Sequence, residues 1–276
     1  MRVPACLAAF TLLILPGALN AAPPPAPVHT PAPLAAHRAM YELTFMPLTG
    51  PRQGNAKQIN GGHGTMGYEV ADVCDGWATR QRLRMTLQNA EGPDVEMESD
   101  YVTWESKDGL SFRFHSVQQV DGSVNTQTDG AAHLTRTGGT GEVRYRIPKD
   151  KKADLPAGTM FPMAHTQVII TAAREGRKFL ALPLFDGTDD NGFEDSSVVI
   201  MDWKQPFETK FKSLDTQPST RMRLAFFDHA GRSQTPGFEE AMRYWENGVA
   251  DDLTMDFGDF VMHGTMTEMT PLPRKC

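Results

Sequence analysis

The stretch Asp72-Val73-Cys74-Asp75-Gly76-Trp77 holds one of the three cysteines of this 276-residue chain. Cys6 lies in an N-terminal segment that we expect to be removed, which leaves Cys74 and Cys276, the last residue. An even pair of cysteines in an exported protein favours a disulfide. Two alternatives stay open, namely two free thiols and an intermolecular bond through Cys276. An intramolecular bond would close a loop of roughly 200 residues and stabilise the fold by about 5 kcal/mol in the chain-entropy model.

Residues 1–22 have the pattern of an export signal peptide. Arg2 precedes an apolar run from Ala5 to Leu15, and small residues follow before a cleavage point after Ala21 or Ala22. The run is well short of the ~20 residues that span a bilayer, which argues against an uncleaved membrane anchor. Cys6 lies near the start of the run, whereas a lipid-modified cysteine would follow it. The sequence therefore predicts a cleaved leader and an exported protein.

Residues 23–36 form a segment rich in proline and alanine. Such a composition favours extended polyproline conformations and offers little apolar surface to bury. We therefore expect a spacer at 23–36 that buries almost nothing. The folded part is then a single domain at 37–276.

The composition is that of an ordinary soluble protein, with 22% charged and 9% aromatic residues. The formal charge is −7, and it becomes −8 when Arg2 leaves with the leader. A basic footprint for nucleic acid or an anionic membrane is absent. The 24 glycines and 20 prolines, with Val, Thr and aromatic residues spread along the chain, favour many short strands joined by turns.

Alternating apolar and polar residues predict a mainly β protein. In His37–Phe45, Ala39, Tyr41, Leu43 and Phe45 fall on one face. The further predicted strands are Gly64–Val73, Trp77–Asn89, Val95–Ser106, Leu110–Val120, Val124–Gly130, Ala132–Arg136, Val143–Ile147, Lys178–Phe185, Ser196–Trp203, Glu208–Leu214, Thr220–Phe227, Met242–Asn247, Leu253–Phe257 and Asp259–Glu268. Turn signals between the early strands indicate an antiparallel meander. This number of strands is too large for one flat open sheet. The sheet should therefore curl or close into a barrel or sandwich.

One segment, Pro162–Glu175, has helical periodicity. Its apolar residues recur near every 3.6 positions, Pro162 suits the first turn, and Gly176 suits the end. A single helix among many strands suggests a lid or plug for the sheet.

The sequence offers no catalytic motif. The histidines of the domain lie far apart, no His-Glu-x-x-His run occurs, and no serine stands in a Gly-x-Ser-x-Gly elbow. We therefore expect no catalytic residue, no cofactor, no metal site and no enzymatic activity, although a triad assembled from distant residues stays open. The acidic stretch Phe185–Gly192 superficially resembles a calcium loop, but it lacks the bidentate glutamate at the twelfth position. A turn is the preferred interpretation.

Methionine is frequent, with 15 residues in the chain. Core filling is the commoner use of methionine, and flexible thioethers also suit apolar binding surfaces. Both interpretations apply to one set of residues: Met160, Met163, Met201, Met222, Met255, Met262, Met266 and Met269.

An ordered set of motifs resembles the envelope integrity protein B (EipB) family of alphaproteobacterial periplasmic proteins. The set comprises a leader with an Ala/Pro spacer, the entry Ala36-His37-Arg38-Ala39-x-Tyr41, the Cys74-Asp75-Gly76-Trp77 region, the Phe185-Asp186-Gly187 turn and the terminal Cys276. The likeness covers essentially the whole mature domain.

This resemblance implies a many-stranded β-sheet curled into a spiral or open barrel with one helix, similar to the periplasmic carriers that ferry lipoproteins. It also implies a disulfide between Cys74 and Cys276 and a non-catalytic periplasmic role in cell-envelope integrity. The expected partners are periplasmic or envelope proteins, with lipid or lipoprotein as further candidates. Nucleic acid is not among them, and the protein is not expected to span a membrane. The alternatives are a carrier of lipid or lipoprotein acyl chains and an unrecognised envelope hydrolase.

The cysteine pairing yields a first prediction. If Cys74 and Cys276 are bonded, Cys74→Ser and Cys276→Ser should each lower the melting temperature by a similar amount, because either change opens the same loop. The double variant should lose little more than either single variant. Strictly additive losses, or an intact mass that shows two free thiols without reductant, would contradict the pairing.

Overall fold

The structure, a computed structural model, describes residues 30–47, 59–229 and 234–274. Its strands form one antiparallel sheet in the order β8-β7-β6-β5-β4-β3-β2-β1-β14-β13-β12-β11-β10-β9. The strands are β1 (His37–Met46), β2 (Ile59–Asp72), β3 (Gly76–Asn89), β4 (Val95–Ser106), β5 (Ser111–Val120), β6 (Ser123–Leu134), β7 (Gly141–Ile147), β8 (Lys152–Leu155), β9 (Phe179–Leu184), β10 (Glu194–Ile200), β11 (Ser219–Asp228), β12 (Phe238–Trp245), β13 (Ala250–Asp256) and β14 (Val261–Pro271). The prediction of a mainly β chain with many antiparallel strands is confirmed.

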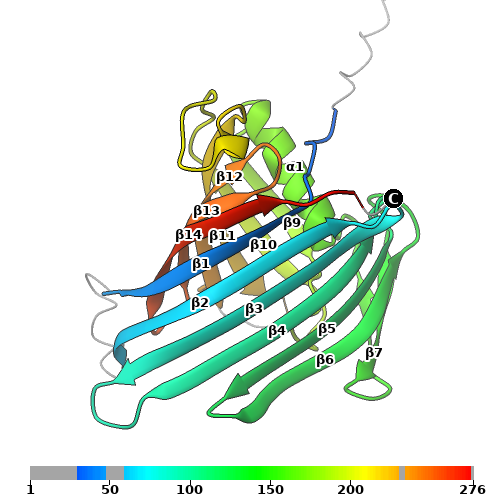
Figure 1. Cartoon of the computed structure of the whole chain (residues 1–276). Coiled ribbons are helices and arrows are strands. Elements are labelled where there is room, and N and C mark those ends of the chain that lie inside the picture. The colour runs from blue at the N-terminus through cyan, green and yellow to red at the C-terminus, as the bar shows by residue number, and fades with distance from the viewer. Residues whose placement is uncertain (1–29, 48–58, 230–233, 275–276) are drawn as a thin grey trace, which may run out of the picture.

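The sheet curls and stays open. Figure 1 shows β9–β13 turned back behind the first half of the sheet. The strands β8 and β9 end the strand order and do not pair with each other, so the curl is a spiral rather than a closed barrel. The first eight strands pair in sequence order, which confirms the predicted meander.

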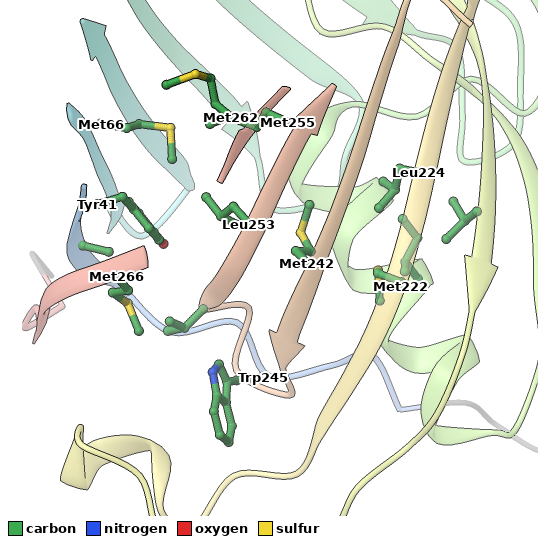
Figure 2. Packing of buried hydrophobic residues seen from close by; sticks show 14 of the residues in the cluster. Tyr41, Met66, Met222, Leu224, Met242, Trp245, Leu253, Met255, Met262 and Met266 are labelled. Atoms are coloured by element: carbon green, nitrogen blue, oxygen red, sulfur yellow. The ribbon is translucent and has the colours of Figure 1, made fainter. Parts of the chain in front are cut away.

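The inner face of the curl carries the main core. On β1, Ala39, Tyr41 and Leu43 are buried, and Arg38 and Glu42 are exposed on the other face. This alternation repeats because successive side chains of a strand point to opposite faces. Figure 2 shows methionine side chains from β2, β12, β13 and β14 gathered with Tyr41, Leu253 and Trp245. Burial on this face therefore holds the two halves of the spiral together.

The single helix, α1 (Pro162–Arg174), packs on the inner face as the plug interpretation predicted. Ile169, Ala172 and Ala173 join the main core. The residue before the helix, Phe161, provides no side-chain cap. Instead both carboxylate oxygens of Glu105 on β4 accept hydrogen bonds, from the N–H groups of Met163 at 2.7 Å and Ala164 at 2.8 Å. A side chain of the sheet thus satisfies helix donors that would otherwise be buried without partners.

An aromatic cluster joins the two ends of the strand order. Phe185, directly after β9, has its ring centroid 5.4 Å from that of Phe114 on β5 and 6.4 Å from those of Tyr145 on β7 and of Phe161. Phe185 is fully buried. Gly187 fits beside the cluster only without a side chain, because an added Cβ would lie 2.4 Å from Phe114 Cγ.

The predicted strand Glu208–Leu214 is wrong. The structure has only a short 3-10 helix, η2 (Lys212–Leu214), in this segment. The alternation of apolar and polar residues imitates a strand, but local side-chain hydrogen bonds decide the conformation. Asp215 Oδ1 accepts from the N–H of Thr209 at 2.7 Å, and Thr209 Oγ1 donates to the carbonyl of Phe211 at 2.8 Å.

Other segments also differ from the prediction, since β2 begins at Ile59 instead of Gly64 and β12 begins at Phe238 instead of Met242. The segments predicted as Val124–Gly130 and Ala132–Arg136 form one strand, β6. Gly130 lies inside the strand where the Phe114 ring approaches closely, since an added Cβ would lie 2.7 Å from Phe114 Cζ. The sequence analysis also missed β8, whose four residues are too short for a periodic pattern.

The end of the proline-rich segment is not a free spacer. Ala32 is 1% exposed, and its N–H donates to Thr171 Oγ1 of α1 at 3.1 Å. Gln167 Nε2 of the same helix donates to the carbonyl of Ala32 at 3.2 Å. The expectation that 23–36 buries almost nothing is therefore wrong for residues 30–36, because small residues fit closely against the helix. The predicted signal peptide and the rest of the spacer lie outside the described residues.

The C-terminal segment returns to the turn that holds Cys74. Arg274 Nε donates to Asp72 Oδ2 at 3.0 Å, and the N–H of Cys74 donates to Asp72 Oδ1 at 3.1 Å. Cys276 lies outside the described residues, so its bond to Cys74 stays a prediction. Arg274 and Cys74 thus both contact Asp72, so the chain lies close to Cys74 two residues before Cys276.

The aromatic cluster yields a stability prediction. Phe185→Ala should lower the free energy of unfolding by about 3–5 kcal/mol, because it opens a cavity at the place where the two ends of the sheet meet. Urea denaturation would measure this loss. The matched control is Phe179→Ala, since Phe179 is 57% exposed and should cost less than about 1 kcal/mol. Equal losses in the two variants would contradict the structural role of the cluster.

Candidate functional site

Apolar side chains line the inner face at the end of the spiral away from α1. They are only half-buried, although they pack against the main core. We call this set the apolar rim: Phe45, Ile59, Val95, Met97, Phe226, Phe238 and Phe257. The fold therefore leaves apolar surface accessible at one end of a curled sheet whose other end holds a helix.

Strand register brings the aromatic part of the apolar rim together. Phe226 and Phe238 are direct partners in the pairing of β11 with β12. Their ring centroids lie 5.9 Å apart, and those of Phe238 and Phe257 lie 5.2 Å apart. These distances are typical of favourable aromatic pairs. The rings of Phe226, Phe238 and Phe257 form a continuous apolar surface across β11, β12 and the end of β13.

A carboxyl group, Glu240, lies deeper on the same inner face. Glu240 follows Phe238 by two positions on β12, so both side chains point inward. Burial raises the pKa of Glu240 to about 7. Burial also raises the pKa values of Tyr68 on β2, to about 12, and of Tyr244 on β12, and the charge of Glu240 raises both further. The inner wall therefore combines apolar surface with a small polar group of side chains.

The sequence analysis did not identify Glu240 or these tyrosines. The sequence does contain a pattern that predicts an inward-facing Glu240, because Phe238, Glu240 and Met242 occupy alternate positions of one strand. A glutamate at the middle position must face the core. Only the fold shows that Tyr68, from the first half of the chain, packs against the same core as β12.

The methionines mostly fill the core. Of the residues considered above, Met163, Met222, Met255, Met262 and Met266 are buried. Met160 and Met269 are half-buried, and Met201 is exposed. The core-filling interpretation therefore accounts for most of the set, and Met97 adds a half-buried methionine to the apolar rim.

The acidic stretch Phe185–Gly192 has the hydrogen bonds of turns. Asp186 Oδ1 accepts from the N–H of Thr188 at 2.9 Å, and Asp189 Oδ1 accepts from the N–H of Asn191 at 2.8 Å. A carboxylate that accepts from the N–H two residues later is an Asx turn. This geometry agrees with the turn interpretation. Across the described residues, no group of three or more His, Cys, Asp or Glu side chains is arranged to hold a metal ion.

The carboxyl of Glu194 lies next to this turn. Burial and the charges of Asp186, Asp189 and Asp228 raise the pKa of Glu194 to about 8. The buried histidine of α1, His165, is instead held neutral, since burial lowers its pKa to about 4. Its Nε2 lies 2.8 Å from Ser196 Oγ on β10, which ties the helix to the sheet.

Two hollows lie elsewhere on the molecule. One of about 870 Å³ is lined by charged side chains of the outer face, among them Arg38, Glu42 and Arg84. The other, of about 680 Å³, lies between the two ends of the strand order and is lined by Leu155 and Pro183, among others. Met97 of the apolar rim also lines the first hollow, and the other six rim residues line neither hollow. No helix in the described parts of the chain is long and apolar enough to cross a membrane.

Comparison with known proteins identifies relatives of the chain. Residues 29–273 match the family described as EipB-like. The curated cell envelope integrity protein EipB of Brucella abortus (strain 2308) is 30% identical over 278 residues, which cover 98% of this chain and 94% of that protein. The crystal structure of a β-barrel-like protein of domain of unknown function DUF1849 from Brucella abortus has a TM-score of 0.76 and 28% identity. The match covers 88% of this chain and all of that structure, 100%.

The raised carboxyl pKa values yield a pH prediction. Glu105, Glu194 and Glu240 all have pKa values of about 7 or 8, above the ordinary 4.5. These three carboxyls therefore bind more protons in the folded protein than in the unfolded chain between about pH 5 and pH 8, and the lowered pKa of His165 opposes them only below about pH 6.5. Stability should fall as the pH rises through this window, because each buried carboxyl then becomes charged. Thermal melts from pH 5 to pH 9 would measure the decrease.

Glu194→Gln should remove part of this decrease. The amide keeps the shape of the side chain and carries no charge, so the variant should gain about 1–2 kcal/mol at pH 9, after allowance for partial exposure. At pH 5 it should match the wild type. Glu91→Gln, at an exposed loop position, is the control and should change stability at neither pH. A stability that rises from pH 5 to pH 9 would contradict the assignment.

Proposed function

Because this chain belongs to the EipB-like family, we propose that it is a non-catalytic periplasmic protein that supports cell-envelope integrity by binding an amphiphilic envelope component on the inner face of its curled sheet. The family assignment supports the envelope role, since a relative carries the name cell envelope integrity protein. The predicted signal peptide supports export to the periplasm. The mode of action is inferred from the site.

The observation that carries this proposal is the apolar rim. Seven half-buried apolar side chains gather at one end of the spiral. Apolar surface left accessible in this way is unfavourable in water and commonly marks a binding site. The rings of Phe226, Phe238 and Phe257 present a surface that suits an acyl chain, because alkyl chains pack on such rings without directional demands.

A carrier of lipid or lipoprotein acyl chains is the more specific form of the same proposal. It would use the same apolar rim and would in addition release the chain at a second membrane. A scaffold for other envelope proteins would instead require contacts on the outer face of the sheet. The half-buried rim favours the binding of an amphiphile over a purely scaffolding role.

Binding of an apolar fluorescent probe tests the proposal. Phenylnaphthylamine should bind the wild-type protein, and Phe238→Ser should weaken the affinity about tenfold, because the change breaks the row of rings and adds a hydroxyl to the apolar surface. Fluorescence titration would measure both affinities. The control is Val124→Ser, which removes an apolar side chain that is 56% exposed at the start of β6. This variant should bind the probe as the wild type does.

A cellular test follows from the same pair of variants. A strain that lacks the gene should be sensitive to detergents and to wall-targeting antibiotics, and the wild-type gene and Val124→Ser should restore resistance. Phe238→Ser, at equal protein level, should not restore it. Absence of probe binding by the wild-type protein, or full rescue by Phe238→Ser, would overturn the proposed binding role.

A further inference from the structure

The two strands that end the sheet differ in how their open edges are protected. On β8, Lys152 and Asp154 are exposed. Charged side chains and short length are typical of edge strands that do not accept a further strand. On β9, the corresponding exposed residues are Phe179 and Ala181, which carry no charge. The edge of β9 therefore lacks the protection that β8 has.

Backbone groups of β9 point to this open edge. The N–H of Ile200 donates to the carbonyl of Lys178 at 2.9 Å, so alternate residues from 178 onward face β10. The N–H and C=O groups of Phe179 and Ala181 therefore point away from β10. Across the described parts of the chain, no strand pairing or loop contact provides a backbone partner for these groups. They are free to bond an added strand.

The chain itself already uses the other end of this edge. Met160 forms an isolated parallel bridge with Leu184. The N–H of Met160 donates to the carbonyl of Pro183 at 2.9 Å, and the N–H of Phe185 donates to the carbonyl of Met160 at 3.0 Å. An extended segment thus fits against this side of β9. Met160 covers only the end of the strand and leaves Phe179 and Ala181 open.

Exposed apolar side chains adjoin the open edge on the outer face. Phe179 is 57% exposed, and its direct partner on β10, Val199, is 48% exposed. Met201 lies two positions after Val199 and is 50% exposed. Cross-strand neighbours of this kind stabilise a sheet when a further strand covers them. Exposed apolar surface next to unpaired backbone groups is typical of a protein interaction site.

Charges of opposite sign lie at the two ends of this edge. Arg177 and Lys178, directly before β9, are exposed. At the other end, Asp154 and Asp195 line the hollow of about 680 Å³. His229 Nδ1 lies 2.9 Å from Asp195 Oδ2 and offsets that carboxylate only when protonated. An antiparallel segment would meet the carboxylates near its start and the basic residues near its end.

We propose that the open edge of β9 binds an extended segment of a partner protein, which adds to the sheet as an antiparallel strand. Only a polypeptide offers N–H and C=O groups at the spacing of Phe179 and Ala181. The segment has apolar side chains on the face of Phe179 and Val199, a basic residue near its start and an acidic residue near its end. This surface is separate from the apolar rim and goes beyond the proposed function.

A single segment suits this edge better than a second copy of the chain. The hollow between β8 and β9 is lined by Leu155 on one side and Pro183 on the other. Pairing of β9 with β9 of another copy would require each molecule to enter the gap of the other. An isolated extended segment needs no such interpenetration, so a partner segment is the occupant that the geometry favours.

A short synthetic peptide tests the proposal. The probe starts with lysine, continues with alternating valine and threonine, ends with glutamate, and carries fluorescein on a C-terminal linker. Fluorescence anisotropy should show binding to the wild-type protein. In the antiparallel pairing, the valine N–H groups face β9 and the threonine N–H groups face away. Methylation of the valine nitrogens should weaken binding about tenfold or more, whereas methylation of the threonine nitrogens should change it less than about twofold.

Variants of Ala181 test the same hydrogen bonds from the side of the protein. Ala181→Pro removes an N–H that points to the open edge, and no bond to β10 is lost. Pro183 already occupies an equivalent position of the strand. This variant should keep the wild-type melting temperature and bind the probe about tenfold more weakly. Ala181→Ser, which keeps the N–H, is the matched control and should bind as the wild type does.

The outcomes decide the proposal whether or not Ala181→Pro folds. Absence of probe binding by the wild-type protein, or equal binding of the two methylated peptides, overturns the edge site and leaves the proposed function intact. Light scattering that shows a dimer of the wild type and a monomer of Ala181→Pro would make a second copy the occupant and would also overturn it. Binding that only valine methylation and Ala181→Pro weaken supports the proposal.

Discussion

The aromatic cluster around Phe185 is the constraint on which the spiral depends. The end strands β8 and β9 do not pair with each other, so the ends are brought together by other contacts, namely the isolated bridge between Met160 and Leu184 and side-chain packing. Phe185 provides that packing after β9, against Phe114 of β5 and Tyr145 of β7. The chain after Phe185 also approaches the Phe114 ring so closely that position 187 has no room for a side chain. Gly187 meets this requirement. The inner face then becomes an enclosed surface, where α1 fills one end and the apolar rim stays accessible at the other.

Much of the fold was predictable because local patterns and tertiary structure agree. Alternation identified most of the strands, and the periodicity of Pro162–Glu175 identified the helix, which ends one residue earlier. The failures have physical reasons. Glu208–Leu214 alternates as a strand does, but Asp215 and Thr209 bind its backbone locally. Ala32 lies in a composition typical of linkers, and it is buried because small residues fit against a helix that the local sequence does not reveal.

The candidate site was much less predictable. Alternation places Glu240 on the inner face, but it gives no information on which residues approach from the first half of the chain. Tyr41 and Tyr68 pack on the same core as the side chains of β12 only because the sheet curls, and curvature is a property of the whole strand order rather than of any segment. Half-burial of the apolar rim is equally a consequence of the curl. The family resemblance, which is confirmed, supplied the envelope role without locating any residue that carries it.

The pairing of β1 with β14 has a consequence for how the chain reaches its native state. His37 is the partner of Pro271, and Met46 is the partner of Val261, so the first and last strands lie side by side in the middle of the sheet. Each meander can grow through neighbours in the sequence, but they join only when the final strand arrives. Contacts between such distant residues close slowly, because the entropy of a long loop must be overcome first. Completion of the sheet therefore has to wait until the whole polypeptide is available.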